Sequence, residues 1–135
     1  MQPAHAHEHP VRVYWEDTDA GGVVFYANYL KFFERARTEW LRALGVGQQA
    51  LADETGAIFV VAHTELRYLA PARLDDALRI TVDLRELGRA AMVVHQQAWR
   101  GEQLLCEGQI QIACVDRGTF RPRRIPTSIT QLISP

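Results

Sequence analysis

Serine, cysteine and lysine are scarce in this chain of 135 residues, and their scarcity limits its chemistry. The only serines are Ser128 and Ser134 in the C-terminal tail, so a Gly-x-Ser-x-Gly nucleophile elbow is absent. Cys106 and Cys114 stand in no recognisable nucleophile motif, neither before a helix nor near a histidine. The sequence also contains no P-loop and no Gly-x-Gly-x-x-Gly pattern. What remains is the chemistry of carboxylates.

Charge and hydropathy exclude several classes of partner. The formal net charge is -1, which is not basic enough for nucleic acid or an anionic membrane to be the main partner. No apolar run reaches the length of a membrane span, and residues 1–10 lack the apolar core of a signal peptide. Cys106 and Cys114 are too far apart along one predicted strand to bond to each other. We therefore expect a cytoplasmic protein with buried free thiols.

The spacing of apolar residues predicts one long helix and several strands. Apolar side chains in residues 29–44 recur with a helical period, many of them aromatic, and Gly45 follows as a stop signal. A second, short helix is expected at residues 48–53, and an irregular tail ending in a helical turn at residues 117–135. Patterns typical of strands occupy residues 11–15, 59–69, 78–84, 91–99 and 103–114.

Short turns between the later strands predict an antiparallel sheet with one polar face. The other face must be buried, and the aromatic helix is the only long element available to cover it. The pattern therefore predicts an α+β fold in which an antiparallel five-stranded sheet wraps around one long central helix. We expect a flexible N-terminus at residues 1–10 and a single domain at residues 11–135. His5, His7 and His9 alternate in the N-terminal segment, but no further ligand is identifiable, so no metal site is predicted.

Two carboxylates one residue apart form the most informative feature. Asp17 and Asp19 follow the first predicted strand and precede Gly21-Gly22 and the aromatic helix. Glycines take φ values that are closed to other residues, so the backbone there can come close to a ligand. The first turn of a helix has unpaired N–H groups and a partial positive charge, and both favour an anion. The layout indicates a carboxylate that faces an oxyanion site.

The same residues resemble a known family. Residues 17–29 read Asp-Thr-Asp-x-x-Gly-x-Val-x-Tyr-x-x-Tyr and residues 33–37 read Phe-Glu-x-x-Arg, which is similar to the signature of hotdog-fold acyl-CoA thioesterases of the 4-hydroxybenzoyl-CoA type. The most similar branch is the bacterial thioesterase associated with the Tol-Pal cell-envelope system. The resemblance continues through Tyr-x-Ala-Pro-Ala-x-Leu-Asp-Asp at residues 68–76 and Cys-Val-Asp at residues 114–116. It covers roughly residues 11–127.

The resemblance implies a hotdog fold that hydrolyses a CoA thioester without a metal or organic cofactor. In this family the second aspartate of the motif is the nucleophile or the general base, and here that residue is Asp19. The backbone amide at the helix start, here that of Tyr26, polarises the thioester carbonyl. Asp17, Gly22 and Val24 are expected to line the substrate site. The carboxylate of Asp17 could instead cap backbone N–H groups in the turn.

Further expectations concern the phosphates of coenzyme A and the subunits. Arg89 falls near a position where relatives place basic residues, so it is a candidate phosphate ligand. Glu34 and Arg37 lie on one helix face and are expected to be paired and structural, and a subunit contact is one place they could line. The resemblance implies a homodimer or homotetramer in which two sheets join edge to edge. The expected partner is an acyl-CoA substrate or an acyl-carrier protein.

Two departures from the family leave the substrate open. Tyr26 stands where the Tol-Pal branch often has His and matches the hydroxybenzoyl-CoA branch, while Trp15 stands where that first branch often has Tyr. The length of the acyl chain and its aromatic or aliphatic character stay open. A non-hydrolytic binding scaffold for acyl-CoA or acyl-carrier protein, linked to cell-envelope lipid metabolism, is an alternative. A hydratase or dehydratase would ordinarily pair the aspartate with a histidine, and no histidine adjoins the motif.

Overall fold

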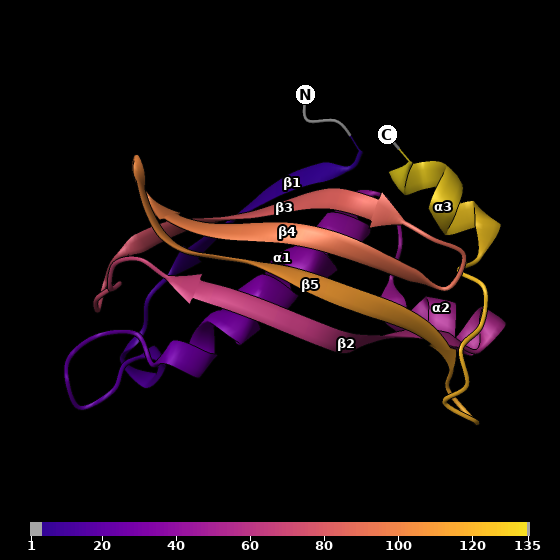
Figure 1. Ribbon diagram of the computed structural model, residues 1–135, viewed down its shortest axis with the longest axis horizontal. Coiled ribbons are helices and arrows are strands. Elements are labelled where there is room, and N and C mark those ends of the chain that lie inside the picture. Colours follow the sequence, from indigo (N-terminus) through magenta and orange to yellow (C-terminus); the bar gives the residue numbers. More distant parts are fainter. Residues whose placement is uncertain (1–3, 135) are drawn as a thin grey trace.

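Every strand of the sheet pairs with its neighbours in the antiparallel direction. The computed structural model describes residues 4–134, and the strand order in the sheet is β1-β3-β4-β5-β2 (Figure 1). The strands are β1 (Ala6–Arg12), β2 (Ala57–Tyr68), β3 (Ala77–Leu87), β4 (Ala91–Arg100) and β5 (Gln103–Asp116). The helices are α1 (Tyr29–Ala43), α2 (Gln48–Thr55) and α3 (Thr127–Ile133), and two 3-10 turns, η1 (Trp15–Asp17) and η2 (Tyr26–Asn28), precede α1.

Helix α1 fills the concave face of this sheet, as Figure 1 shows. Its buried side chains follow a helical spacing and include Phe32, Phe33 and Trp40. The strands supply the opposing wall, because alternate residues of β3 and β4 are buried while those between them are not. The predicted α+β fold, with a five-stranded antiparallel sheet wrapped around one long helix, is confirmed.

The N-terminal strand corrects the sequence-based boundaries. Ala6–Arg12 forms β1 and pairs with Ala77–Asp83 of β3, whereas a flexible segment had been expected through residue 10. The carbonyl of Ala4 also accepts a hydrogen bond from Nε1 of Trp40 at 2.7 Å. A strand at the edge of a sheet is held by backbone hydrogen bonds, which require no apolar side chains. The histidine-rich segment therefore forms a strand although its sequence lacks the apolar alternation from which strands are predicted. The strand ends at Arg12, so only the first two residues of the strand predicted at residues 11–15 belong to β1.

The remaining boundaries agree closely with expectation. The long helix begins at Tyr29 as predicted, and Gly56 ends α2 with a φ of 79°. The tail forms α3, which buries Ile129 and Ile133 against the core. Within residues 4–134, no helix is long and apolar enough to cross a membrane.

Gly108 lets β2 and β5 approach each other closely. It lies opposite Leu66 in the β2–β5 ladder and opposite Gln96 in the β4–β5 ladder. A Cβ atom at this position would overlap the carbonyl oxygen of Glu65. Backbone cannot yield as a flexible side chain can, so this position requires glycine.

Replacing Gly108 with alanine should therefore destabilise the fold. We expect Gly108→Ala to lower the free energy of unfolding by about 1–3 kcal/mol, because the added methyl group forces two strands apart. Denaturant titration measures this change. Gly47→Ala is a matched control, since the nearest atom to its new Cβ would be the Cβ of Ala50 at 3.9 Å. Equal losses in the two variants would contradict the steric explanation.

Candidate active site

The segment between β1 and α1 folds back on itself as a small hairpin. The N–H of Phe25 donates to the carbonyl of Asp17 and the N–H of Asp19 donates to the carbonyl of Val23, both at 2.9 Å. The tip is a turn in which the N–H of Gly22 donates to the carbonyl of Asp19 at 3.1 Å. Gly22 has a φ of 80°, a conformation in which a Cβ atom would be strained. The predicted glycine turn is present, and it places Asp19 at the tip.

Asp17 points into the protein and holds the hairpin in place. Its side chain is 5% exposed. Oδ2 accepts the N–H of Tyr14 at 2.8 Å, and Oδ1 accepts the side-chain amide of Asn28 at 2.8 Å. Both oxygens are therefore engaged by the protein itself, which matches the local capping role rather than a contact with substrate. Asn28 directly precedes α1, but its side chain makes no capping hydrogen bond to that helix.

Asp19 is placed differently, although it is only two residues further along. It is exposed to solvent, and Oδ1 accepts the N–H of Gly21 at 2.8 Å. A Cβ atom on Gly21 would lie 3.2 Å from that same oxygen, so a small residue is needed beside the carboxylate. Within the described residues, Oδ2 of Asp19 accepts no hydrogen bond. One oxygen is thus fixed and the other faces solvent, an arrangement that suits a base or nucleophile.

Tyr26 begins the helical region that leads into α1. It is the first residue of η2, so its N–H has no partner inside the turn. Among residues 4–134, no other acceptor receives this N–H. The carbonyl of Tyr26 accepts the hydroxyl of Tyr68 from the end of β2 at 2.9 Å. An N–H that donates to no acceptor among the described residues therefore lies at the helix start, where an oxyanion donor was predicted, and Tyr68 ties this peptide to the sheet.

Sequence reasoning missed the role of Tyr68. It recognised Tyr68 as part of the family signature, but nothing in its spacing shows that β2 ends beside η2. The rings of Tyr26 and Tyr68 lie 6.4 Å apart and those of Tyr29 and Tyr68 lie 5.7 Å apart. Burial raises the pKa of the Tyr68 hydroxyl and raises that of Tyr29 to about 12. The hydroxyl of Tyr68 therefore stays protonated and available as a donor at neutral pH.

Val24 anchors the hairpin to the segment before β3. It is 5% exposed, and its N–H donates to the carbonyl of Ala72 at 2.8 Å. Val23 forms a bridge with Arg73 in the same segment. Val24 had been expected to line the substrate site, and the structure makes it part of the core beneath that site.

Arg89 lies at the other end of the sheet. It follows β3, and the residues just before β3, Asp75 and Asp76, bond to Val13 beside the hairpin. The length of β3 separates the two ends by on the order of 35 Å. Figure 1 shows the loop before α1 at one end of the sheet and the β3–β4 turn at the other. Within one chain, Arg89 and Asp19 therefore do not form a single site.

Glu34 and Arg37 do not form the expected ion pair among the described residues. The Arg37 guanidinium donates to Oε1 of Gln96 at 3.0 Å, and desolvation lowers the pKa of Arg37. Gln96 is fully buried and donates in turn to the carbonyl of Phe33 at 3.0 Å. Glu34 reaches solvent and accepts the hydroxyl of Thr38 at 2.7 Å. Both residues make structural hydrogen bonds, but their partners are the neutral side chains of Gln96 and Thr38 and not each other.

Comparison with known proteins agrees with this geometry. The family model described as the thioesterase-like superfamily matches residues 13–133. The chain belongs to this family. It is 44% identical over 120 residues to the acyl-CoA thioesterase YbgC of Haemophilus influenzae, with 89% of this chain and 88% of the relative covered. It is 48% identical over 121 residues to the acyl-CoA thioester hydrolase YbgC of Escherichia coli O6:H1, covering 89% and 90%.

A solved structure shares the fold at appreciable sequence identity. The probable thioesterase from Bartonella henselae is 37% identical and superposes with a TM-score of 0.84, covering 90% of this chain and 99% of that one. The protein is thus an enzyme of the thioester hydrolase class. Its hotdog fold, which the signature had implied, is confirmed.

The two aspartates should differ in their effect on stability. Asp17→Ala leaves the Asn28 amide and the Tyr14 N–H without an acceptor, so we expect a loss of about 2–3 kcal/mol in the free energy of unfolding. Asp19→Ala removes an exposed carboxylate and should cost under about 1 kcal/mol. Chemical denaturation of both variants checks this difference. A milder effect for Asp17→Ala than for Asp19→Ala would contradict the structural role of Asp17.

Proposed function

We propose that this protein is an acyl-CoA thioesterase in which Asp19 acts on a thioester carbonyl polarised by the backbone N–H of Tyr26. The observation that carries the proposal is the free carboxylate oxygen of Asp19 on the same short loop as an unpaired helix-start amide. The CoA thioester as substrate is supported by the names of the two YbgC relatives. Gly22 supports the site by giving the turn its shape.

The chemistry needs one carboxylate and one anion-stabilising donor. In one route Asp19 takes a proton from a water molecule whose oxygen attacks the carbonyl carbon. In the other, an oxygen of Asp19 attacks directly and forms a mixed anhydride that water then hydrolyses. In both routes the C–S bond breaks and the CoA sulfur leaves and takes up a proton. The charge that develops on the carbonyl oxygen is stabilised by the Tyr26 amide, a type of donor worth on the order of 3 kcal/mol.

The two routes differ in where the oxygen of water ends up. After a single turnover in water labelled with oxygen-18, the anhydride route leaves label in Asp19 only if water attacks at its carboxyl carbon. Label found in Asp19 after one turnover, by mass spectrometry of the peptide that contains it, is therefore evidence for the anhydride route. Attack of water at the acyl carbon of the anhydride puts the label in the released acid instead. General-base catalysis puts label only in the released acid.

An edge-to-edge dimer would complete the site. β2 is an edge strand, and Val61, Ala62 and His63 are exposed along it. If β2 pairs antiparallel with β2 of a second copy, the end of the sheet that carries Arg89 in one copy comes beside the end that carries Asp19 in the other. We include this homodimer, or a dimer of such dimers, in the proposal. Arg89 from the second copy is then the candidate for the CoA phosphates.

Other functions predict different outcomes. A non-hydrolytic scaffold that binds acyl-CoA or acyl-carrier protein in cell-envelope lipid metabolism would bind acyl groups but would not depend on Asp19. Association with the Tol-Pal system and a cytoplasmic location stay predictions, as does an acyl-carrier protein as an alternative donor of the acyl group. No residue beside Asp19 supplies the histidine that a hydratase would ordinarily use.

Loss of the Asp19 carboxylate should abolish turnover. We expect Asp19→Asn to lower kcat by at least about a hundredfold on CoA thioesters, because the amide neither accepts the proton nor attacks. Release of free thiol from aliphatic and hydroxybenzoyl thioesters measures this loss. Glu16→Gln, which neutralises a neighbouring exposed carboxylate, should stay near the wild type. Sedimentation of all three proteins confirms an equal oligomeric state, and full turnover in Asp19→Asn would refute the mechanism.

Tyr68 should act as a positioning residue for the Tyr26 peptide. Tyr68→Phe removes one hydrogen bond, so we expect kcat to fall about threefold to tenfold while KM changes less. Steady-state kinetics on the best thioester, with a thermal melt to confirm folding, provides the measurement. A fall in stability with kcat intact would show that the hydroxyl serves only the fold.

A further inference from the structure

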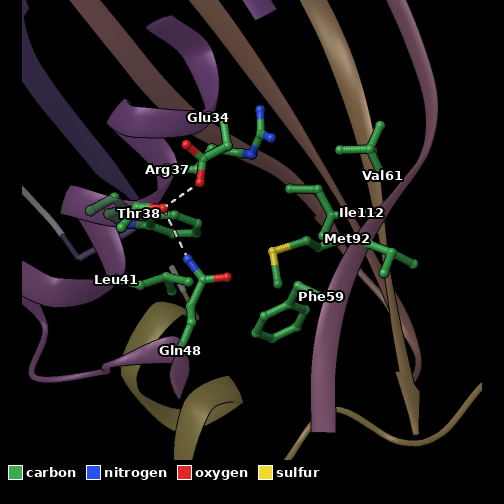
Figure 2. Close-up of a pocket in the computed structure, with 11 residues that line it drawn as sticks. Glu34, Arg37, Thr38, Leu41, Gln48, Phe59, Val61, Met92 and Ile112 are labelled. Carbon is green, nitrogen blue, oxygen red and sulfur yellow. Dashed lines mark hydrogen bonds between the residues drawn. The ribbon is translucent and has the colours of Figure 1, made fainter. Parts of the chain in front are cut away.

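A pocket of about 150 Å³ lies between the second half of α1 and the first half of β2. Figure 2 shows Phe59, Met92 and Ile112 facing Leu41 and Gln48 across it. Met92 and Ile112 belong to the hydrophobic core, so the sheet side of the pocket is apolar, and Leu41 of the core adds an apolar side chain on the helix side. The site at Asp19 and Tyr26 uses none of these residues.

The polar residues of the pocket are already bonded to one another. The hydroxyl of Thr38 donates to Glu34 at 2.7 Å, and the side-chain amide of Gln48 donates to Thr38 at 3.0 Å (Figure 2). Arg37, the remaining charged group of the lining, is bonded to Gln96. Because these groups are satisfied within the protein, a ligand in the pocket gains most from apolar contact.

A second hollow continues the pocket toward the helix start. It shares Glu34, Arg37 and Val61 with the pocket, and its other lining residues are Leu30, Lys31 and Arg35. Leu30, Val61 and the methylene stems of the charged side chains form its apolar surface. Leu30 is 43% exposed and Val61 is 51% exposed, so each offers an apolar side chain to a ligand in this hollow. Leu30, Glu34 and Arg37 lie on one face of α1, so the two hollows form one path along the helix.

We propose that this path binds the hydrocarbon tail of the acyl group, with its end in the pocket beside Met92 and Ile112. The inference rests on the proposed function and assigns its substrate class as long-chain aliphatic CoA thioesters. The thioester carbonyl is held at the Tyr26 amide, and the tail runs along α1 beneath β2.

The dimensions of the path set the chain length. At about 1.5 Å per residue, Glu34 lies about 12 Å and Thr38 about 18 Å from Tyr26 along the helix. An extended chain advances about 1.25 Å per carbon, given bonds of about 1.5 Å at tetrahedral angles. About ten carbons therefore reach the pocket mouth, and about fourteen reach Thr38. A cavity of this size holds about six carbons, since an engineered cavity of about 150 Å³ binds benzene.

Chain-length profiles of kcat/KM test the proposal. Hexanoyl, decanoyl, tetradecanoyl and octadecanoyl-CoA are compared for the wild type, Ile112→Phe and Phe59→Ala. We expect the wild-type value to rise at least about tenfold from decanoyl to tetradecanoyl, since each buried methylene contributes about fourfold. Ile112→Phe fills the pocket and should bring that ratio close to one. Phe59→Ala enlarges it and should raise the ratio of octadecanoyl to tetradecanoyl.

Val93→Phe is the matched control, because Val93 lies on the opposite face of β4 from Met92 and Val94. It should keep the wild-type ratio of kcat/KM for tetradecanoyl-CoA to that for decanoyl-CoA. Binding of a non-hydrolysable tetradecyl-CoA thioether, measured by calorimetry, separates the pocket from the chemistry. Binding that is weakened by Ile112→Phe, without turnover in any protein, would refute the proposed function and support the pocket. A flat profile in the wild type, or profiles and binding that neither Ile112→Phe nor Phe59→Ala shifts, would overturn the pocket proposal.

Discussion

The burial of one face of α1 inside the curved sheet is the constraint on which the rest of the structure depends. Phe32 and Phe33 are fully buried against the strands, and Trp40 is 2% exposed. Polar bonds fix the rotation of the helix as well, because buried Gln96 donates to the carbonyl of Phe33 while accepting from Arg37. With the helix fixed in this way, its first turn can lie only at the end of the sheet where β2 finishes and β3 begins.

That placement explains why two aspartates so close in sequence have different environments. Asp17 is the last residue of η1, whereas the carbonyl of Asp19 opens the glycine turn at the hairpin tip, so the two side chains have different surroundings. Asp17 faces inward and meets the donors of Tyr14 and Asn28. Asp19 reaches the tip, where glycine backbone and solvent are its neighbours. The buried carboxylate of Asp17 thus holds the loop on which the carboxylate of Asp19 is exposed. The two side chains are chemically identical, so their different roles follow from their positions in the fold.

Much of this could be predicted from the sequence, and the failures have a common cause. The helix from Tyr29 and the strands after residue 57 were predicted well, because the spacing of their apolar residues along the chain is itself the signal of a helix or a strand. The start of β1 was placed too late in the sequence, because its backbone hydrogen bonds to β3 do not depend on the pattern of its side chains. The role of Tyr68 was missed for a related reason, and so was the distance between Arg89 and Asp19 within one chain. The residues that lie near a given turn depend on the order of the strands in the sheet. The position of β2 at the edge, beside β5, cannot be predicted from the short connections between successive strands.

The residues that close the family signature show how a structural role can shape a site. Arg37 bonds to Gln96 of β4 and so fixes the distance between α1 and the sheet. Glu34 accepts the hydroxyl of Thr38, which in turn accepts a hydrogen bond from the side chain of Gln48 at the start of α2. Because these bonds satisfy the polar groups on the helix side, the space between α1 and β2 is left to apolar walls. In the proposed mechanism, the signature places the carboxylate of Asp19 before the start of α1, and its later residues, Glu34 and Arg37, shape the surface along which we propose that a hydrocarbon chain lies.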